Sequence, residues 1–247
     1  MKKIIVAATI ATALSLPALT AGAITNGEID TKHDFVGAMT GNDPGGTQRL
    51  CSGSLIAEGV FLTAGHCTVL TDVQITFGDD RSNPDAVFDA TQVLRHPQYA
   101  ANFGKQFDVG LVLFDQGGVE LPTGVLADAN YIDGFTQAEL KTFTFETFGY
   151  GLVRDEANGN SSPLGTDPLR RAATQTYLNQ HNQYLGLSIH NNKGNGGGCS
   201  GDSGGPHLLH DVIVSVTSNG DANCVATDNT QRIDQPIIRD WILSYVN

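Results

Sequence analysis

The chain contains few basic residues, few cysteines, and little tryptophan or methionine. Its 247 residues include 14 Lys and Arg against 26 Asp and Glu, four Cys, one Trp and two Met. A net charge of −12 argues against the basic patch that phosphate contacts need, so we expect no nucleic acid partner and no attraction to anionic membranes. The cysteines have no C-x-x-C spacing, which disfavours a zinc site, and we expect no metal ion and no cofactor.

Long apolar runs are also scarce, and the longest lies at the start of the chain. Lys2 and Lys3 precede an uncharged apolar stretch that Pro17 interrupts, and Ala21-Gly22-Ala23 follows. This order is typical of a secretory signal with a small-x-small cleavage site, whereas Thr, Ser and Pro weaken the stretch as a membrane anchor. We expect residues 1–23 to be a signal peptide and the mature chain to be secreted, extracellular or periplasmic, without stable membrane association. Its removal takes away two lysines and no acid, so the net charge falls from −12 to −14.

A candidate nucleophile stands in the hexapeptide Gly201-Asp202-Ser203-Gly204-Gly205-Pro206, four residues after Cys199. A serine hydroxyl needs a base to activate it and donors to stabilise the oxyanion formed on attack. Small neighbours leave the Ser203 hydroxyl open, and glycine at 201 lets the amides of Gly201 and Ser203 point at one spot. The alternative is a glycine-rich surface turn, in a chain with 29 glycines.

A candidate base stands in Thr63-Ala-Gly-His66-Cys67, which Cys51 precedes. A histidine titrates near neutrality and is the usual proton acceptor for such a serine. A lone histidine is more often structural, but His66 lies between a small dipeptide and a half-cystine candidate. The pattern therefore favours a catalytic histidine.

With these two motifs, the chain from Ile24 onward resembles the trypsin/chymotrypsin family of serine peptidases. In that family the histidine comes first, the aspartate second and the serine last. The segment Phe107-Asp108-Val109-Gly110 resembles the family's stretch in which an aspartate opens an apolar strand, so Asp108 is the expected third member. A carboxylate at the start of a buried run can orient the imidazole while it is shielded from water. The other aspartates weighed for this role are Asp72, Asp79, Asp80, Asp89 and Asp115.

The resemblance implies an all-β fold of two antiparallel six-stranded β-barrels with the active site between them and a C-terminal helix. We expect barrels at residues 24–130 and 131–235 and a helix at 236–247. Short apolar or alternating runs bounded by Gly, Asn, Asp and Pro predict strands at 60–63, 73–77, 109–114, 142–148 and 212–216. Pro236 can begin a helix whose shared face carries Ile237, Ile238, Trp241, Ile242 and Tyr245.

The resemblance also implies two disulfides and an activation ion pair. Four cysteines of an exported protein allow three pairings, and the family pattern selects Cys51–Cys67 and Cys199–Cys224. In the family a new amino terminus folds inward and pairs with the aspartate before the nucleophile. Cleavage after Ala23 would expose Ile24, with Asp202 as its partner.

The substrate pocket is expected to involve Gly197, Gly198, Ser218, Gly220 and Thr230. Trypsin-like members of the family carry an aspartate six residues before the nucleophile, where this chain has Gly197. An uncharged pocket with Thr230 on its far wall would accept an apolar side chain. The alternative is a register in which Asp228 reaches the pocket and selects Lys or Arg.

These features together predict a secreted serine endopeptidase that acts through an acyl-enzyme intermediate, with Gly201 and Ser203 amides as the oxyanion hole. The alternative is a non-catalytic secreted binding protein on the same scaffold. An esterase of another fold is disfavoured, because the histidine precedes the Gly-x-Ser-x-Gly pattern and no helix pattern follows it. Expected partners are protein or peptide substrates and protein inhibitors, and the chain is expected to be a monomer. A calcium loop at Asp79, Asp80 and Asp85 is weighed against a solvated acidic turn.

Overall fold

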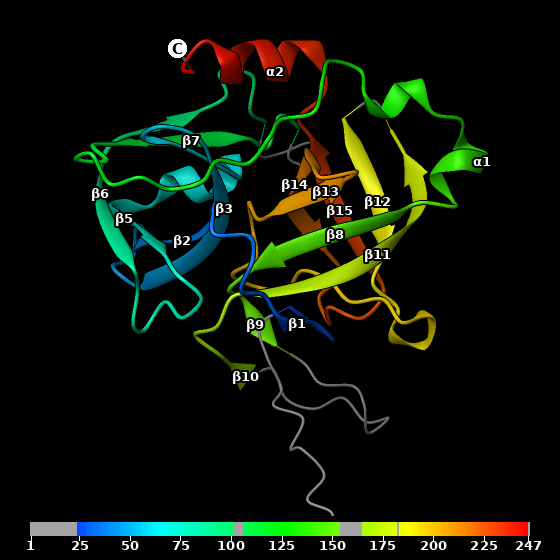
Figure 1. Cartoon of the computed structure of the whole chain (residues 1–247), viewed down its shortest axis with the longest axis horizontal. Coiled ribbons are helices and arrows are strands. Elements are labelled where there is room, and N and C mark those ends of the chain that lie inside the picture. The colour runs from blue at the N-terminus through cyan, green and yellow to red at the C-terminus, as the bar shows by residue number, and fades with distance from the viewer. Residues whose placement is uncertain (1–23, 101–105, 154–164, 182, 247) are drawn as a thin grey trace, which may run out of the picture.

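A computed structural model describes residues 24–100, 106–153, 165–181 and 183–246, and Figure 1 shows a structure built mostly from strands. The predicted signal peptide lies outside the described residues. Within them, no helix is both long and apolar enough to cross a membrane.

The first barrel is a closed antiparallel sheet in the order β2-β3-β4-β7-β6-β5. Pairing of β2 with β5, for example Met39 with Ile75, closes it. The larger buried side chains in its interior include Leu55, Phe61 and Phe77. The strands are β2 Val36–Asn42, β3 Gln48–Ala57, β4 Val60–Thr63, β5 Thr71–Phe77, β6 Ala86–Arg95 and β7 Gly110–Phe114.

The second barrel follows the order β11-β12-β15-β14-β13-β8, and pairing of β8 with β11 closes it. Its interior is filled by Phe145, Tyr177, Leu185, Leu187 and Val214. The strands are β8 Thr144–Gly149, β11 Arg171–Gln180, β12 Tyr184–Ser188, β13 Pro206–Leu209, β14 Val212–Gly220 and β15 Thr227–Arg232. The predicted all-β fold of two six-stranded antiparallel barrels is confirmed.

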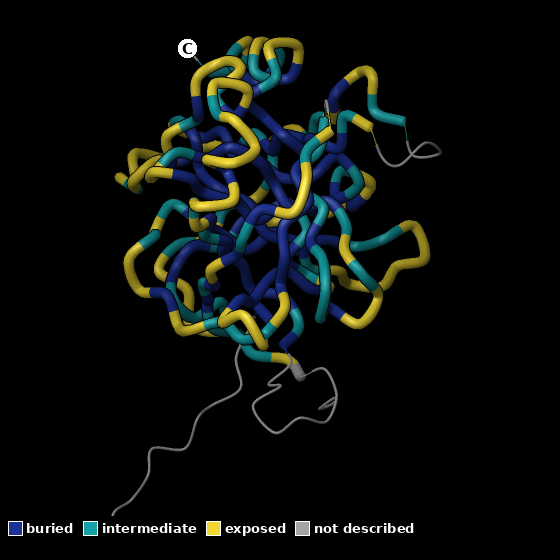
Figure 2. The backbone as a smooth tube through the Cα atoms, turned by 90° about the vertical axis from the view of Figure 1, so that its right-hand side faces the viewer, coloured by how far each residue is buried: buried dark blue, intermediate teal, exposed yellow. Residues whose placement is uncertain are grey.

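Short elements lie outside the barrels. Strand β1 Glu28–Ile29 adds to the edge of β11, and β9 Leu152–Val153 pairs with β10 Gly165–Thr166. Helix α1 Gln137–Leu140 precedes β8 and begins with a capping box between Thr136 and Glu139. Figure 2 shows buried backbone along the strands and exposed backbone mainly in the connecting turns.

A continuous apolar core joins the two barrels. Leu62 and Leu111 of the first barrel belong to the same buried cluster as Phe148 and Val216 of the second. The hydroxyl of the buried Tyr150 lies in the same region and donates to main-chain oxygens of the first barrel. The two barrels, which stand side by side in Figure 1, therefore present a shared and well-packed boundary.

Helix α2 Pro236–Leu243 begins with proline in its first turn, as predicted. Ile238 and Ile242 are fully buried, and Trp241 contacts the ring of His96 at a centroid distance of 5.0 Å. The expectation that Ile237 shares this face is wrong, since its side chain is 49% exposed. With about 100° per residue, Ile237 lies about 100° from Ile238 and about 140° from Ile242 around the helix axis, so it falls outside the face that these two residues bury.

Candidate active site

The structure brings Asp108 directly to His66. The backbone N–H of His66 donates to Asp108 Oδ1 at 2.7 Å, and His66 Nδ1 lies 2.9 Å from Asp108 Oδ2. His66 lies in a short 3-10 helix that follows β4, and Asp108 lies just before β7, the neighbour of β4 in the sheet. A carboxylate can only accept here, so Nδ1 carries the hydrogen and Nε2 keeps its lone pair free to take a proton.

Asp108 is fully buried and is held by two further contacts. Ser218 Oγ donates to Asp108 Oδ2 at 2.5 Å, and the Asp108 N–H donates to the side chain of Gln231 at 2.9 Å. The hydrogen bond from Ser218 is charge-assisted and holds the carboxylate in one orientation, whereas the bond to Gln231 holds the backbone of Asp108. The link from Ser218 to Asp108 was not foreseen, because Ser218 was assigned only to the pocket.

The aspartates that were weighed against Asp108 are engaged elsewhere. Asp79 binds Arg170, and Asp80 accepts from the backbone and hydroxyl of Ser82. Gln74 and Asn42 donate to Asp89 and Asp72, and Gly117 donates to Asp115. Among the described residues, no cluster of three His, Cys, Asp or Glu side chains is placed to hold a metal ion.

Ser203 lies against the segment that carries His66. Its carbonyl accepts from the Ser52 N–H at 2.8 Å and lies 3.8 Å from Cys67 Sγ, one residue after the histidine. The predicted disulfides Cys51–Cys67 and Cys199–Cys224 are both confirmed. One therefore secures the histidine segment, and the other secures the segment that leads into the serine.

The turn around Ser203 requires glycine on both sides. Gly201 has φ of +101° and Gly204 has φ of +85°, in a region that side chains disfavour. A Cβ on Gly201 would stand 2.7 Å from the Gly151 Cα, and one on Gly204 would overlap the Thr63 hydroxyl. Among the described residues, neither the Gly201 nor the Ser203 amide donates to another main-chain group.

Asp202 is fully buried between the two barrels, and backbone groups hold its carboxylate. The N–H groups of Gly151 and Cys199 donate to its two oxygens at 2.7 and 2.9 Å. Burial raises the pKa of Asp202 to about 7, although these two hydrogen bonds oppose the effect. No lysine, arginine or histidine of the described segments forms an ion pair with it.

The first described residues lie close to the serine segment. Ile24 is fully buried, and Thr25 pairs with Gly197 through two backbone hydrogen bonds of 2.9 and 3.0 Å. This pairing places the residue after Ile24 beside Gly197, which lies five positions before Asp202 in the sequence.

A cavity of about 220 Å³ opens beside Ser203. Of the five residues expected in the pocket, Gly198, Ser218 and Gly220 line it. Its complete lining is Gly198, Cys199, Ser200, Ser203, Thr217, Ser218, Asn219, Gly220, Asp221, Ala222, Cys224 and Asp228.

Two expected pocket residues lie elsewhere. Gly197 pairs with Thr25, and Thr230 donates to Ser215 Oγ at 2.8 Å inside the barrel. Thr230 lies two positions after Asp228 in β15, on the same buried side of the strand, and contacts Ser215 instead of the cavity. Local sequence does not show which residue of this side ends the pocket.

Asp228 takes the position that was expected for an uncharged side chain. It is 1% exposed, and its Oδ2 accepts from Gly198 N at 3.2 Å and from Gln175 Nε2 at 3.1 Å. Burial raises the pKa of Asp228 to about 6, which these two donors oppose. His207 Nε2 lies 3.8 Å from Asp228 Oδ2, but burial keeps the His207 ring neutral. The pocket therefore ends on a carboxyl group that has no cationic partner among the described residues.

Gln175 and His207 were missed by the sequence analysis. Both are fully buried polar side chains at inward positions of strands. Alternation in β11 places Gln175 on the same side as Ala173 and Tyr177, and this irregularity is the signal that could have found it.

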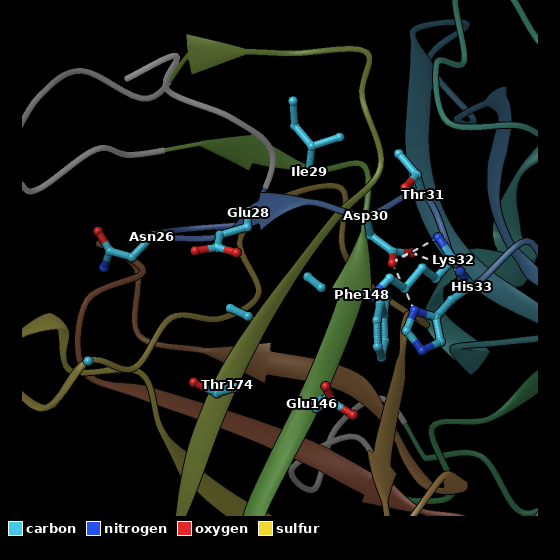
Figure 3. Close-up of a pocket in the computed structure, with 13 residues that line it drawn as sticks. Asn26, Glu28, Ile29, Asp30, Thr31, Lys32, His33, Glu146, Phe148 and Thr174 are labelled. Atoms are coloured by element: carbon cyan, nitrogen blue, oxygen red, sulfur yellow. Dashed lines mark hydrogen bonds and ion pairs between the residues drawn. The ribbon is translucent and has the colours of Figure 1, made fainter. Parts of the chain in front are cut away.

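A separate cavity of about 400 Å³ lies beside β1, β8 and β11, and Figure 3 shows its lining. His33 borders it, with Nδ1 2.8 Å from Asp30 Oδ1 and the ring 4.2 Å from that of Phe148. None of its lining residues also lines the cavity beside Ser203. The two cavities are therefore distinct.

Comparisons with known proteins identify the same family that the sequence motifs resemble. Residues 24–242 match the family model described as Trypsin. The chain is 29% identical over 196 residues to a protein named "Trypsin" from Saccharopolyspora erythraea, covering 76% of this chain and 82% of that protein. It is 27% identical to "Lectizyme" from Glossina austeni, covering 87% and 83% of the two chains. A solved structure titled "HL collagenase" superposes with a TM-score of 0.70 at 17% identity, covering 86% of this chain and 93% of that one.

Proposed function

Because the chain belongs to the trypsin family of serine proteases, we propose that it is an endopeptidase with Ser203 as nucleophile, His66 as general base and Asp108 as the residue that orients it. The observation that carries the proposal is the double contact of Asp108 with the backbone and imidazole of His66, next to a serine in a glycine-bounded turn. Peptide or protein substrates are expected for a trypsin-like protease. The non-catalytic binding protein remains the alternative.

The geometry supports acyl transfer in two steps. His66 Nε2 takes the Ser203 proton as the oxygen attacks the substrate carbonyl, while Asp108 stabilises the imidazolium. The Gly201 and Ser203 amides donate to the developing oxyanion, and His66 returns the proton to the leaving amine. Water then repeats the sequence on the acyl-enzyme.

The proposed preference is for Lys or Arg before the cleaved bond. Asp228 lines the cavity beside Ser203 and is buried, so an incoming cation would replace the water that its carboxylate has lost. Thr230, on which the expected apolar preference depended, does not line this cavity. An apolar preference is the outcome that would contradict this part of the proposal.

The proposed activation follows secretion. Signal peptidase cleavage after Ala23 would free the Ile24 amine, and this amine would pair with Asp202. Support comes from the buried Ile24, the pairing of Thr25 with Gly197 and the buried carboxylate of Asp202. N-terminal sequencing of active protein tests this step, and a fully active terminus several residues from Ile24 would contradict it. A monomer without metal or cofactor completes the proposal.

The decisive experiment is covalent labelling of the mature protein with an organophosphonate. Wild type should be labelled at Ser203, and Ser203→Ala should remain unlabelled and lose turnover by about 10⁴-fold or more. Peptides that differ only in Arg or Leu before the cut should then rank Arg first. Correctly processed wild type that is neither labelled nor active would favour the binding protein instead.

A further inference from the structure

A row of three buried polar side chains runs from the pocket into the second barrel. Asp228 of β15 lies 3.1 Å from Gln175 Nε2 of β11, and Gln175 Oε1 lies 2.9 Å from His207 Nδ1 of β13. Gln175 and His207 are fully buried, and Asp228 is 1% exposed. Neither Gln175 nor His207 has a role in the proposed bond cleavage. Burying such polar side chains costs free energy unless they are hydrogen-bonded, so their partners indicate what they do.

The hydrogen bonds in this row determine where the protons lie. An ionised Asp228 can only accept, so the Gln175 amide must turn its nitrogen toward it and its oxygen toward His207. That oxygen also only accepts, so His207 carries its hydrogen on Nδ1. The unprotonated Nε2 then accepts from the Thr217 hydroxyl, 2.8 Å away. Burial lowers the pKa of His207 to about 3, so the ring stays neutral.

The reverse arrangement is favourable only for a neutral pocket. If the amide of Gln175 turned by half a rotation, its oxygen would face Asp228, and a carboxyl proton would be needed to bridge them. His207 would then have to accept at Nδ1 and carry its hydrogen on Nε2. The tautomer of His207, the orientation of Gln175 and the charge of Asp228 are therefore linked.

We propose that His207 and Gln175 are positioning residues that hold Asp228 ionised and correctly oriented to receive a cationic substrate side chain. This inference depends on the proposed peptidase function and adds the groups that set the charge of its pocket. His207 orients the Gln175 amide, and Gln175 in turn holds Asp228 through the hydrogen bond that its Nε2 donates.

Other charges near Asp228 act in the opposite direction. Asp221 raises the pKa of Asp228, and the buried Asp202 and Asp228 repel each other. Burial is the largest effect and brings the pKa of Asp228 to about 6. Recognition of a cation requires the ionised form, so it should be complete above about pH 7 and be lost as the pH falls through 6.

The test compares pH profiles of KM for two peptides that differ only in Arg or Leu before the cut. In Gln175→Met, the acidic midpoint for the Arg peptide should move up by about one pH unit, because Asp228 loses a donor to its charged form. The Leu peptide should keep its profile and its kcat. Gln116→Met is the matched control, since Gln116 is also buried and makes two hydrogen bonds, but in the first barrel.

An unchanged Arg midpoint in Gln175→Met, or an equal shift for the Leu peptide, would overturn the inference. Wild type that cleaves neither peptide would instead contradict the proposed function. Nitrogen-15 NMR of Ser203→Ala tests the proton positions without activity or a Gln175 variant. His207 should be the Nδ1–H tautomer at pH 8, and the Nε2–H tautomer there would overturn the inference.

Discussion

Buried arginines and buried carboxylates of this chain are satisfied in different ways. Arg170 is fully buried and contacts three carboxylates, those of Asp30, Asp34 and Asp79, at 2.8 to 2.9 Å. Arg232 is likewise buried and is paired with Asp133 and Asp234 at 2.8 Å. The two guanidinium groups thus have their counter-charges within the fold.

Asp202 and Asp228 have no such counter-charge among the described side chains. Each is buried and accepts only N–H donors from the backbone or an amide. Burial raises the pKa of both, which means that the folded protein holds each carboxylate at a cost. The arginine clusters contribute to stability within the fold, whereas the proposed function supplies the cations that the two carboxylates lack: the amine of Ile24 for Asp202 and the substrate side chain for Asp228.

The largest effect should come from Asp202→Asn. Without the charge, the Ile24 amine would have no partner and the oxyanion hole would not be held, so we expect kcat/KM to fall by about 10³-fold or more. Circular dichroism should show a folded protein. Asp228→Asn is the matched control and should keep its activity on a Leu peptide. Full activity of Asp202→Asn would show that the charge of Asp202 is not needed for function, and would contradict the role proposed for this buried carboxylate.

A stability effect should follow from Arg170→Met. Loss of the guanidinium leaves the buried Asp30 carboxylate with His33 as its remaining side-chain partner, which should cost about 3 kcal/mol of unfolding free energy. The exposed pair of Arg49 and Asp43 provides the control, because Arg49→Met should cost less than about 1 kcal/mol. Urea unfolding measures both, and equal losses would contradict the assigned difference between buried and exposed pairs.

The last effect varies with pH and reaches its full size only above about pH 7; it concerns the stability of Asp228→Asn. The pKa of Asp228 is about 6 in the folded state, above its ordinary value of 3.8, so its ionisation favours the unfolded chain. This cost is absent below about pH 4 and complete above about pH 7, and it amounts to at most about 3 kcal/mol. Asp228→Asn should therefore gain stability relative to wild type as the pH rises.

A control with the opposite sign is available in Asp80. The hydroxyl and backbone of Ser82 lower the pKa of Asp80, so its ionisation favours the folded state. Asp80→Asn should lose stability relative to wild type as the pH rises from 3. Thermal melts across this range would show both trends, and a common sign would contradict the assignment for Asp228.

Local motifs allowed much of the fold and site to be predicted. The glycine-bounded Ser203 turn and the segment before Cys67 each occupy a few contiguous residues, so their backbone geometry follows from their own sequence. The disulfides, the two-barrel fold and the start of α2 at Pro236 were confirmed. The resemblance supplied the expected order of His66, Asp108 and Ser203, and the structure places Asp108 on His66.

What the sequence could not determine depends on contacts between distant strands. The placement of β15 in the second barrel decides that Asp228, rather than Thr230, lines the pocket. The row from Asp228 through Gln175 to His207 joins residues of three strands, and these residues are 21 or more positions apart in the sequence. The sequence by itself determined which residues can carry the chemistry and the backbone geometry of their short motifs. Only the tertiary structure decided which buried polar groups meet, because strand register and hydrogen-bond partners are set by packing between segments.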